Sequence, residues 1–502
     1  MKSDSKMNLN PIVGFIGKPA HQFTKSDIIR YVKENEIQML NFMYLAADGR
    51  LKTLNFVISD EDYLDMILTY GERIDGSNIF PHIGSGNSDL YVIPRFRTAF
   101  MDPFSDMPTL CLLCSYFDKD GERLKSSSEY TLDKAAAAFT QQTGLVMQAM
   151  AELEYYVIDK EENTGGLYGV ADQRGYHESG PFTKFNEFRK QCMLYISQTG
   201  GMIKYGHSEV GNFTLDGKIY EQNEIEFLPT DMSDVADKTI IAKWIIMNLA
   251  YEYGLDVSFA PKIIAGEAGS GMHIHMCFLK DGKNVMLKNG ILSDTARKAI
   301  AGMITLAPSI SAFGNTNPTS YQRLVPHQEA PTSICWGDRN RSVLIRVPLG
   351  WTMKNDMSGT VNPLEEAKSS FTQEKQTVEM RSPDCTADIY QLLAGLCVAC
   401  RYGLSMDNAL EIAERTYVDV NIHSEENKEK LNSLEHLPDS CYESSKQLER
   451  QRAIYEEYDV FSPQIIDQII CKLTSYNDKN LREDIKANPD LVRELVAKYF
   501  YY

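Results

Sequence analysis

The sequence has no apolar run near the roughly 18 uncharged residues that a membrane-spanning helix needs, and no signal-peptide pattern at its start. Basic residues are also scarce: 51 Lys and Arg stand against 69 Asp and Glu, a net charge of −18. This deficit argues against a nucleic-acid partner and against an anionic membrane surface, because both attract a surplus of basic side chains. We therefore expect a cytoplasmic protein.

Two glycine-rich nucleotide patterns are missing as well. Neither GxxxxGK nor GxGxxG occurs in the 502 residues. A bound nucleotide would therefore have to be held by metal and arginine rather than by a glycine cradle for its phosphates.

The ten cysteines include two CxxC pairs, Cys111/Cys114 and Cys397/Cys400. The first pair lies in a predicted strand, where residues three apart face opposite sides. The second lies in a predicted helix, where cysteine acts as a small apolar residue. These contexts disfavour zinc, and we expect the thiols to stay reduced.

The remaining composition is that of an ordinary globular chain, 43% hydrophobic. Residues 1–120 are predicted to form a small, mostly β domain, with one hairpin that turns at Asp48-Gly49. Helical periodicity is evident in residues 128–144 and 231–254, and again from about 389 onward.

Several well-separated segments alternate acids or imidazoles with apolar residues, as a strand with one polar face does. The polar pairs are Glu152/Glu154, His207/Glu209, Glu224/Glu226, His273/His275 and Glu379/Arg381. Each pair alone is more typical of a solvated sheet face, yet an antiparallel sheet could converge them. Close carboxylates repel unless a cation lies between them, and an oxygen-rich set with imidazole predicts Mg²⁺ or Mn²⁺.

Residues 314–348 carry four arginines, Arg323, Arg339, Arg341 and Arg346, in a chain that is otherwise acidic. The planar guanidinium suits carboxylates and phosphates. Metals beside an arginine cluster are what phosphoryl transfer requires.

Taken together, these segments resemble the glutamine synthetase family in its bacterial, long-chain form. Nine motifs in the family's order carry the resemblance: Asp75-Gly-Ser with Ser88-Asp89; Ala151-Glu-Leu-Glu154; His207-Ser-Glu-Val with Gln222-Asn-Glu224; Phe259-Ala-Pro-Lys262; Gly269-Ser-Gly-Met-His-Ile-His275; Asn317-Pro-Thr-Ser-Tyr-Gln-Arg-Leu-Val-Pro326; Glu329-Ala-Pro331; Asn340-Arg-Ser342 with Ile345-Arg-Val-Pro348; and Val378-Glu-Met-Arg381. Each motif is short, but nine in order are specific.

The resemblance implies an α+β fold. A small N-terminal β-grasp domain (1–120) would precede a large catalytic domain (121–502) with a curved antiparallel sheet, surrounding helices and a helical region from about residue 389. It further implies a dodecamer of two stacked hexameric rings, in which neighbouring subunits share each active site.

The resemblance also implies roles for individual residues. The metal ligands would be Glu154, Glu209 and Glu224 at one site and Glu152, His273 and Glu379 at the other. Substrate glutamate and ammonium would meet Gly269, Arg323, Arg381 and Tyr176. The ATP phosphates would meet Arg341 and Arg346, with His275 near the nucleotide. Asp75 of the adjacent subunit would take a proton from ammonium, and Glu329 would close the ammonia site.

Four departures from the family pattern stand out. Ala268 replaces an asparagine that contacts the amino-acid substrate, and His327-Gln328 replaces Gly plus an aromatic residue before Glu329. The connection from Glu209 to Glu224 is several residues longer. Glu435 occupies the place of a tyrosine that is adenylylated in some members.

The sequence thus predicts ATP-dependent ligation of ammonia to L-glutamate, with Mg²⁺ or Mn²⁺ as cofactor and an acyl phosphate as intermediate. A γ-glutamyl ligase of the same fold that uses a polyamine or another amine is an alternative. An inactive paralogue with a binding or scaffold role is another, although all six expected metal positions are filled.

Overall fold

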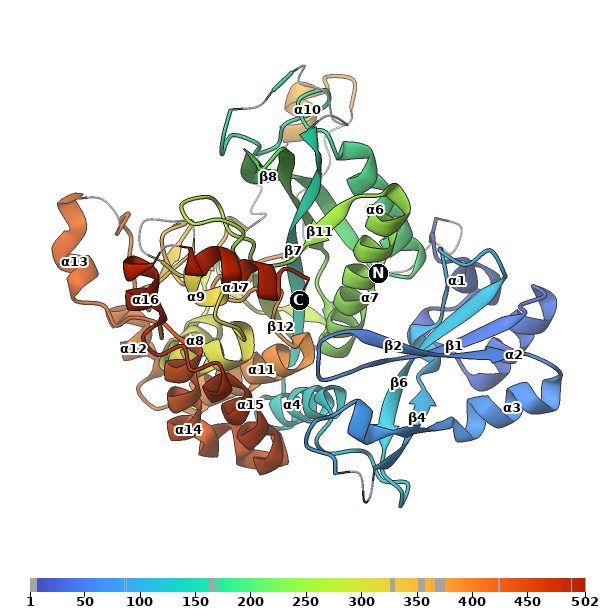
Figure 1. The fold of residues 1–502 in the computed structure, drawn as a ribbon. Helices are drawn as coiled ribbons and strands as arrows, with labels where there is room; N and C mark the ends of the chain where they lie inside the picture. Colours follow the sequence, from blue (N-terminus) through green and yellow to red (C-terminus); the bar gives the residue numbers. More distant parts are fainter. Residues whose placement is uncertain are drawn as a thin grey trace.

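The computed structural model describes residues 7–84, 86, 88–161, 168–169, 171–325, 330–350, 357–365, 375–422, 425–488 and 490–501. They form two large β-sheets with helices on both sides, which confirms the predicted α+β class (Figure 1).

The N-terminal sheet has the strand order β2-β1-β6-β4-β3, with β5 paired to β6. Its strands are β1 (Met39–Leu45), β2 (Leu51–Val57), β3 (Glu72–Asp75), β4 (Asp89–Pro94), β5 (Phe100–Met101) and β6 (Thr109–Phe117). The predicted hairpin is β1 paired antiparallel with β2, and Gly49 in its turn has φ +77°. Helices α1 (Pro11–Ile16), α2 (Lys25–Glu34) and α3 (Glu61–Tyr70) share the core of this sheet.

Strand β6 is buried on both faces, because successive side chains in a strand point in opposite directions. Cys114 packs with the helices of the N-terminal sheet, whereas Cys111 belongs to the core of the rest of the chain. The two cysteines of the first CxxC pair therefore lie in different cores, as the strand interpretation predicts.

The second sheet has the order β16-β17-β18-β12-β7-β9-β8. Its strands are β7 (Val146–Lys160), β8 (Ile203–Leu215), β9 (Lys218–Phe227), β12 (Ile274–Lys280), β16 (Trp336–Asp338), β17 (Ile345–Val347) and β18 (Val378–Met380). The short strands β10 (Thr230–Asp231) and β11 (Asp256–Ser258) also pair with β7. All pairs except β16 with β17 run antiparallel.

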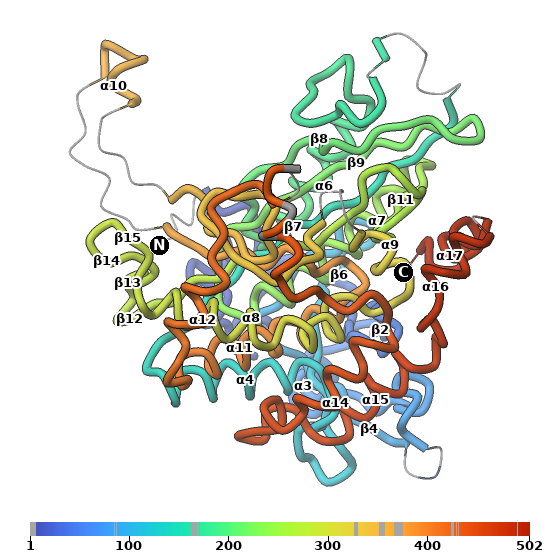
Figure 2. The backbone as a smooth tube through the Cα atoms, turned by 90° about the vertical axis from the view of Figure 1, so that its left-hand side faces the viewer, coloured from blue at the N-terminus to red at the C-terminus, as the bar shows by residue number. Residues whose placement is uncertain are grey.

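Strands β8 and β9 form a long hairpin that contains the connection from Glu209 to Glu224 (Figure 2). It turns at Asp216-Gly217, where φ is +49° and +72°, as two-residue hairpin turns require. Pairing skips from Ser208 to Asn212 on β8, while it advances only two residues on β9, so β8 contains a bulge.

Helices pack against the second sheet and build the main core. They include α4 (Ser128–Thr143), α6 (Asn186–Gln198), α7 (Met232–Tyr253), α8 (Asp294–Gly314), α11 (Ile389–Ser405), α14 (Cys441–Glu456) and α15 (Pro463–Ser475). Within the described residues, no single helix is long and apolar enough to cross a membrane; α11 and α12 (Ala409–Arg415) meet that test only as a pair bent by 108°.

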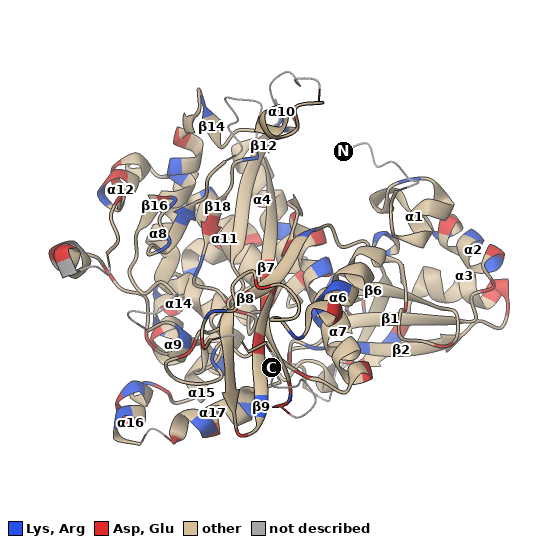
Figure 3. Ribbon diagram, turned by 90° about the horizontal axis from the view of Figure 1, so that it is seen from above, with Lys and Arg blue, Asp and Glu red and all other residues tan. Residues whose placement is uncertain are grey.

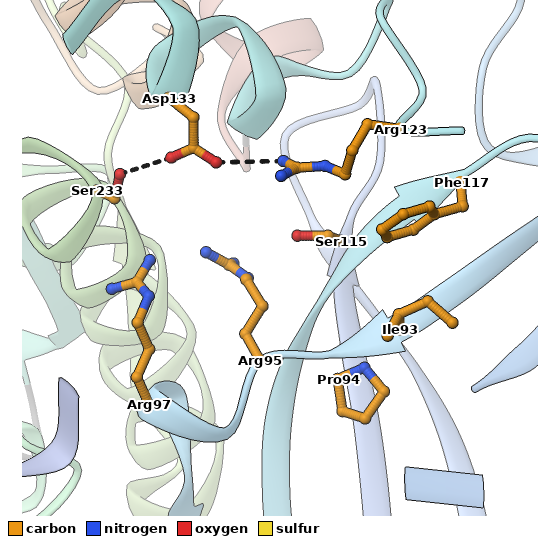
Figure 4. A pocket seen from close by; sticks show the side chains of 9 residues that line it. All are labelled: Ile93, Pro94, Arg95, Arg97, Ser115, Phe117, Arg123, Asp133 and Ser233. Carbon is orange, nitrogen blue, oxygen red and sulfur yellow. Dashed lines mark hydrogen bonds and ion pairs between the residues drawn. The ribbon is translucent and has the colours of Figure 1, made fainter. Parts of the chain in front are cut away.

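Ion pairs join the N-terminal sheet to α7, and a tyrosine of α11 adds hydrogen bonds. Arg95 and Arg97 follow β4 and contact Asp237, which is fully buried, at 2.8 and 2.7 Å. The hydroxyl of Tyr390 donates to the same carboxylate. A hollow of about 330 Å³ opens beside these arginines, and Asp133 bridges Arg123 and Ser233 at its rim (Figure 4). The pairings largely neutralise the arginines, so this junction serves to dock the two sheets.

Candidate metal and substrate site

The predicted polar faces converge on neighbouring strands of the second sheet. On β7 and β9, Glu152 lies opposite Glu226 and Glu154 opposite Glu224, and His207 on β8 lies opposite Glu224. Figure 3 shows acidic residues along these strands near the middle of the molecule. Antiparallel pairing thus brings together side chains that are far apart in the sequence.

The first cluster consists of Glu152, His273 and Glu379, whose ligand atoms all lie within 4.8 Å of one another. His273 Nδ1 is 2.9 Å from a carboxylate oxygen of Glu152 and 3.4 Å from one of Glu379. These are the three residues predicted to form one of the two metal sites.

Cationic groups surround the first cluster. Arg346 and Arg381 donate to the two oxygens of Glu379, at 3.0 and 3.1 Å, and His275 Nε2 is 2.9 Å from Glu152. Burial raises the pKa of Glu152 and Glu379, but the charges of His275 and His273 outweigh it, so both carboxyls end below the ordinary 4.5. Both are therefore ionised at neutral pH.

The second cluster consists of His207, Glu224 and Glu226. His207 Nε2 is 3.2 Å from Glu224, and Lys204 pairs with Glu226 at 2.5 Å. Burial raises the pKa of Glu224 well above 4.5, and the neighbouring carboxylates, Glu152 and Glu154 foremost, raise it further. Burial lowers the pKa of His207, which keeps the imidazole neutral and able to bind a cation.

The second cluster shares Glu224 with the predicted set of Glu154, Glu209 and Glu224, which stays a prediction. Glu209 lies in the β8 bulge and is 3.6 Å from His207 Nδ1, and Glu154 is 3.8 Å from His273 Nε2. His207 and Glu226 also lie close to Glu224. Their alternation with Glu209 and Glu224 is visible in the sequence, and the register of the hairpin brings them together.

Residues 268–271 form a loop against the first cluster. Glu154 accepts from the Gly271 N–H at 2.7 Å, and Gln222 donates to the Gly269 carbonyl at 3.1 Å. A Cβ at Gly269 would lie 2.4 Å from the carbonyl oxygen of Pro261 and 3.0 Å from Cγ of Arg323. Glycine is therefore required at 269 by close packing.

The predicted arginines differ in their surroundings. Arg323 is buried and donates to the carbonyls of Ser382 and Arg381 at 2.8 and 3.2 Å, with one nitrogen 3.4 Å from His273. Arg341 is exposed, and its carbonyl accepts from Arg381. Arg323, Arg346 and Arg381 thus border the first cluster.

Tyr176 lies beside the second cluster. Its ring stacks on His177 with centroids 4.1 Å apart and lies 5.5 Å from His207. The rings of His177 and His207 are themselves 4.2 Å apart.

Asp75 lies in the N-terminal sheet, exposed, and makes no contact with either cluster within the described chain. Its carboxylate accepts from Ser77 and Asn78, and these bonds, that of Ser77 foremost, hold its pKa below 3.8. Glu329 and the departure His327-Gln328 lie outside the described residues.

The donors fit divalent cations. Buried carboxylates converge with imidazole nitrogens in both clusters, and such oxygen-rich sets suit Mg²⁺ or Mn²⁺. Burial and the neighbouring carboxylates raise the pKa of Glu224, and a bound cation would offset this repulsion.

Comparisons with known proteins agree with this architecture. The model of the glutamine synthetase catalytic domain matches residues 128–487, and that of the glutamine synthetase beta-Grasp domain matches residues 36–119. A glutamine synthetase of Clostridium saccharobutylicum is 31% identical over 430 residues, which cover 84% of this chain and 88% of that protein.

Two further proteins are similar to this chain, one by sequence and one by structure. A 3-hydroxylaminophenol mutase of Cupriavidus pinatubonensis is 31% identical over 353 residues, 64% of this chain and 73% of that protein. The cryoEM structure of Plasmodium falciparum glutamine synthetase matches with a TM-score of 0.73 at 18% identity, over 92% of this chain and 97% of that one. Because the two family models span both sheets, the chain belongs to the glutamine synthetase family.

Proposed function

We propose that this protein is an ATP-dependent ligase that joins ammonia to the side-chain carboxylate of L-glutamate. The observation that carries the proposal is the first cluster, three metal-ligand side chains flanked by Arg346 and Arg381 on one sheet face. A carboxylate is a poor electrophile, so ATP would first convert it to an acyl phosphate.

Two divalent cations, Mg²⁺ or Mn²⁺, fit the site. Glu152, His273 and Glu379 would hold one, and His207, Glu224 and Glu226 the other, with Glu154 between them. Such cations offset the negative charge that keeps a carboxylate and a triphosphate apart.

The chain's own groups would bind and orient the glutamate. The Gly269 N–H has no acceptor among the described residues and is free to donate to the substrate. Arg323 is held in place by backbone carbonyls beside this loop, and Arg381 lies next to it. Arg341, Arg346 and His275 would bind the ATP phosphates.

A base must deprotonate ammonium before it can attack. Asp75 is ionised and exposed, but it lies away from the clusters of its own chain. We infer that it serves the site of an adjacent subunit in a ring assembly, a dodecamer by family resemblance, located in the cytoplasm. Glu329 would close the ammonia site and keep water from the acyl phosphate.

A second candidate is a γ-glutamyl ligase that acts on a larger amine. The rings of Tyr176, His177 and His207 lie beside the carboxylates of the second cluster. Aromatic faces next to carboxylates suit an organic cation.

One assay tests both candidates. Phosphate release from ATP would be measured with glutamate and Mg²⁺ or Mn²⁺, in the presence of ammonium or of a panel that includes methylamine, ethanolamine and putrescine. The first proposal expects the highest kcat/KM with ammonium. A higher value with an organic amine would establish the second, and no metal-dependent activity with any acceptor would refute both.

A further inference from the structure

The loop that contains Gly269 is held at Ala268 by two side chains from other segments. The Ala268 N–H donates to Oε1 of Gln173 at 2.8 Å, and its carbonyl accepts from the hydroxyl of Tyr156 at 2.8 Å. Both polar groups of the Ala268 backbone are therefore engaged, although its own side chain is only a methyl group.

Gln173 is itself anchored to β8 at the residue that follows the bulge. Its N–H and its side-chain Nε2 both donate to the Asn212 carbonyl, at 3.2 and 3.3 Å. Gly175 and His177 donate in turn to Val210 and Ser208. Residues 173–177 thus run beside the bulged part of β8 and carry Gln173 to the Ala268 loop.

The same loop is tied to the metal-bearing strands on its other side. Gln222 on β9 donates to the Gly269 carbonyl and to Glu154, at 3.1 and 3.2 Å, and Glu154 accepts from Gly271. Three consecutive peptide units are therefore held by side chains: Glu267–Ala268 by Gln173, Ala268–Gly269 by Tyr156 and Gly269–Ser270 by Gln222. The plane of the middle peptide determines the direction of the Gly269 N–H, which has no acceptor among the described residues.

We propose that Gln173 is a positioning residue for glutamate: it holds the Glu267–Ala268 peptide and, together with Tyr156 on the next peptide, directs the Gly269 N–H at the bound amino acid. The proposal rests on the proposed ligase function. The methyl group of Ala268 cannot form a hydrogen bond. In this chain the side chain of Gln173 provides one to the loop. Tyr176, which is expected to meet ammonium, lies three residues after Gln173 and beside the second cluster. Gln173 therefore also connects the Ala268 loop to the segment that contains Tyr176.

Three variants separate positioning from general stability. Gln173→Leu removes both the acceptor for Ala268 and the Nε2 donor to Asn212, whereas Gln173→Glu loses only the donor and keeps a side-chain oxygen at the same reach. Gln141→Leu, at an exposed position on α4, is the matched control for the loss of an amide.

We expect Gln173→Leu to raise the KM for glutamate about tenfold, the worth of one well-placed hydrogen bond, with kcat and the KM for ATP changed less than about twofold. Gln173→Glu should recover most of the glutamate KM, and Gln141→Leu should match the parent protein. An unchanged glutamate KM in Gln173→Leu, or equal changes in all three parameters, would overturn the proposal.

Hydrogen exchange provides a readout that needs no turnover. Amide exchange of a peptide that spans residues 264–272 should be faster in Gln173→Leu than in the parent or in Gln173→Glu, while peptides from α11 stay unchanged. Absence of ligase activity in the parent would refute the proposed function alone. Unchanged exchange at 264–272 would refute the anchoring role of Gln173 even in an active enzyme.

Discussion

The two clusters on the second sheet contain the same groups, two carboxylates and one imidazole, in opposite electrostatic surroundings. In the first, Arg346, Arg381 and His275 contact the carboxylates and their pKa values fall. In the second, Lys204 pairs with Glu226 alone, and burial together with neighbouring acids raises the pKa of Glu224. The first cluster is balanced by the protein itself, and the second needs a cation or a proton.

This difference indicates how each cluster depends on metal. The first is kept in place by ion pairs and should retain its geometry without a cation. The second holds mutually repelling carboxylates, so cation binding there competes with protonation. The comparison can be tested at both clusters with matched variants.

The largest effect is expected from Glu379→Ala. Loss of this carboxylate removes a ligand of the first cluster and leaves two arginines unpaired, so metal-dependent phosphate release should fall on the order of 1000-fold. Glu187→Ala, at an exposed helical position whose ion-pair partner is Lys190, is the control. Unchanged activity in Glu379→Ala would refute the assignment of the first cluster.

The pH dependence of Mn²⁺ binding should distinguish the second cluster. Glu224 has a raised pKa, so below that value its carboxyl holds a proton that the cation must displace. Affinity should therefore increase with pH through this range, by about tenfold per unit, and level off above it. Titrations followed by electron paramagnetic resonance would measure this slope, and Glu224→Gln should abolish it. A slope that persists in Glu224→Gln would assign the proton to another group.

Stability without metal should change in opposite directions at the two clusters. In chelator, Glu379→Gln should lower the free energy of unfolding by about 3 kcal/mol, because Arg346 and Arg381 lose a buried partner. Glu224→Gln should raise it by about 1 kcal/mol, because it removes one of several repelling carboxylates. Urea denaturation midpoints report both; equal signs would contradict the difference drawn between the clusters.

The smallest effect tests whether Glu209 or His207 contributes more to cation binding at the second cluster. Glu209→Gln should weaken Mn²⁺ binding at the second cluster by less than about threefold, whereas His207→Gln should weaken it by about tenfold or more. Calorimetric titration at fixed pH measures both. The reverse order would favour the predicted set that contains Glu209.

Much of the fold and of the first cluster could be predicted because short-range patterns determine them. Alternation along β7 placed Glu152 and Glu154 on one face, and the position of His273 after two glycines located the adjoining strand. Asp48-Gly49 marked its hairpin correctly. These features depend on side-chain period and turn chemistry, which the sequence displays directly.

The second cluster could not be resolved in the same way, because its membership depends on register. Three residues of β8, from Glu209 to Gly211, form the bulge and shift Glu209 out of the alternation. Gly211 is the residue in the sequence that indicates the bulge, because a Cβ there would lie 2.0 Å from the Tyr156 hydroxyl. Glycine inside a strand suggests a bulge, but not which partner residues it displaces.

Strand β6, with Cys111 in one core and Cys114 in the other, has a consequence for how the molecule can be divided. Removing the N-terminal residues would uncover the apolar side of α7, where Trp244 packs on Phe100 and Phe104. The catalytic half would then expose surface that favours aggregation. Because β6 contributes to both cores, the two halves should unfold together. The catalytic half should therefore not fold alone.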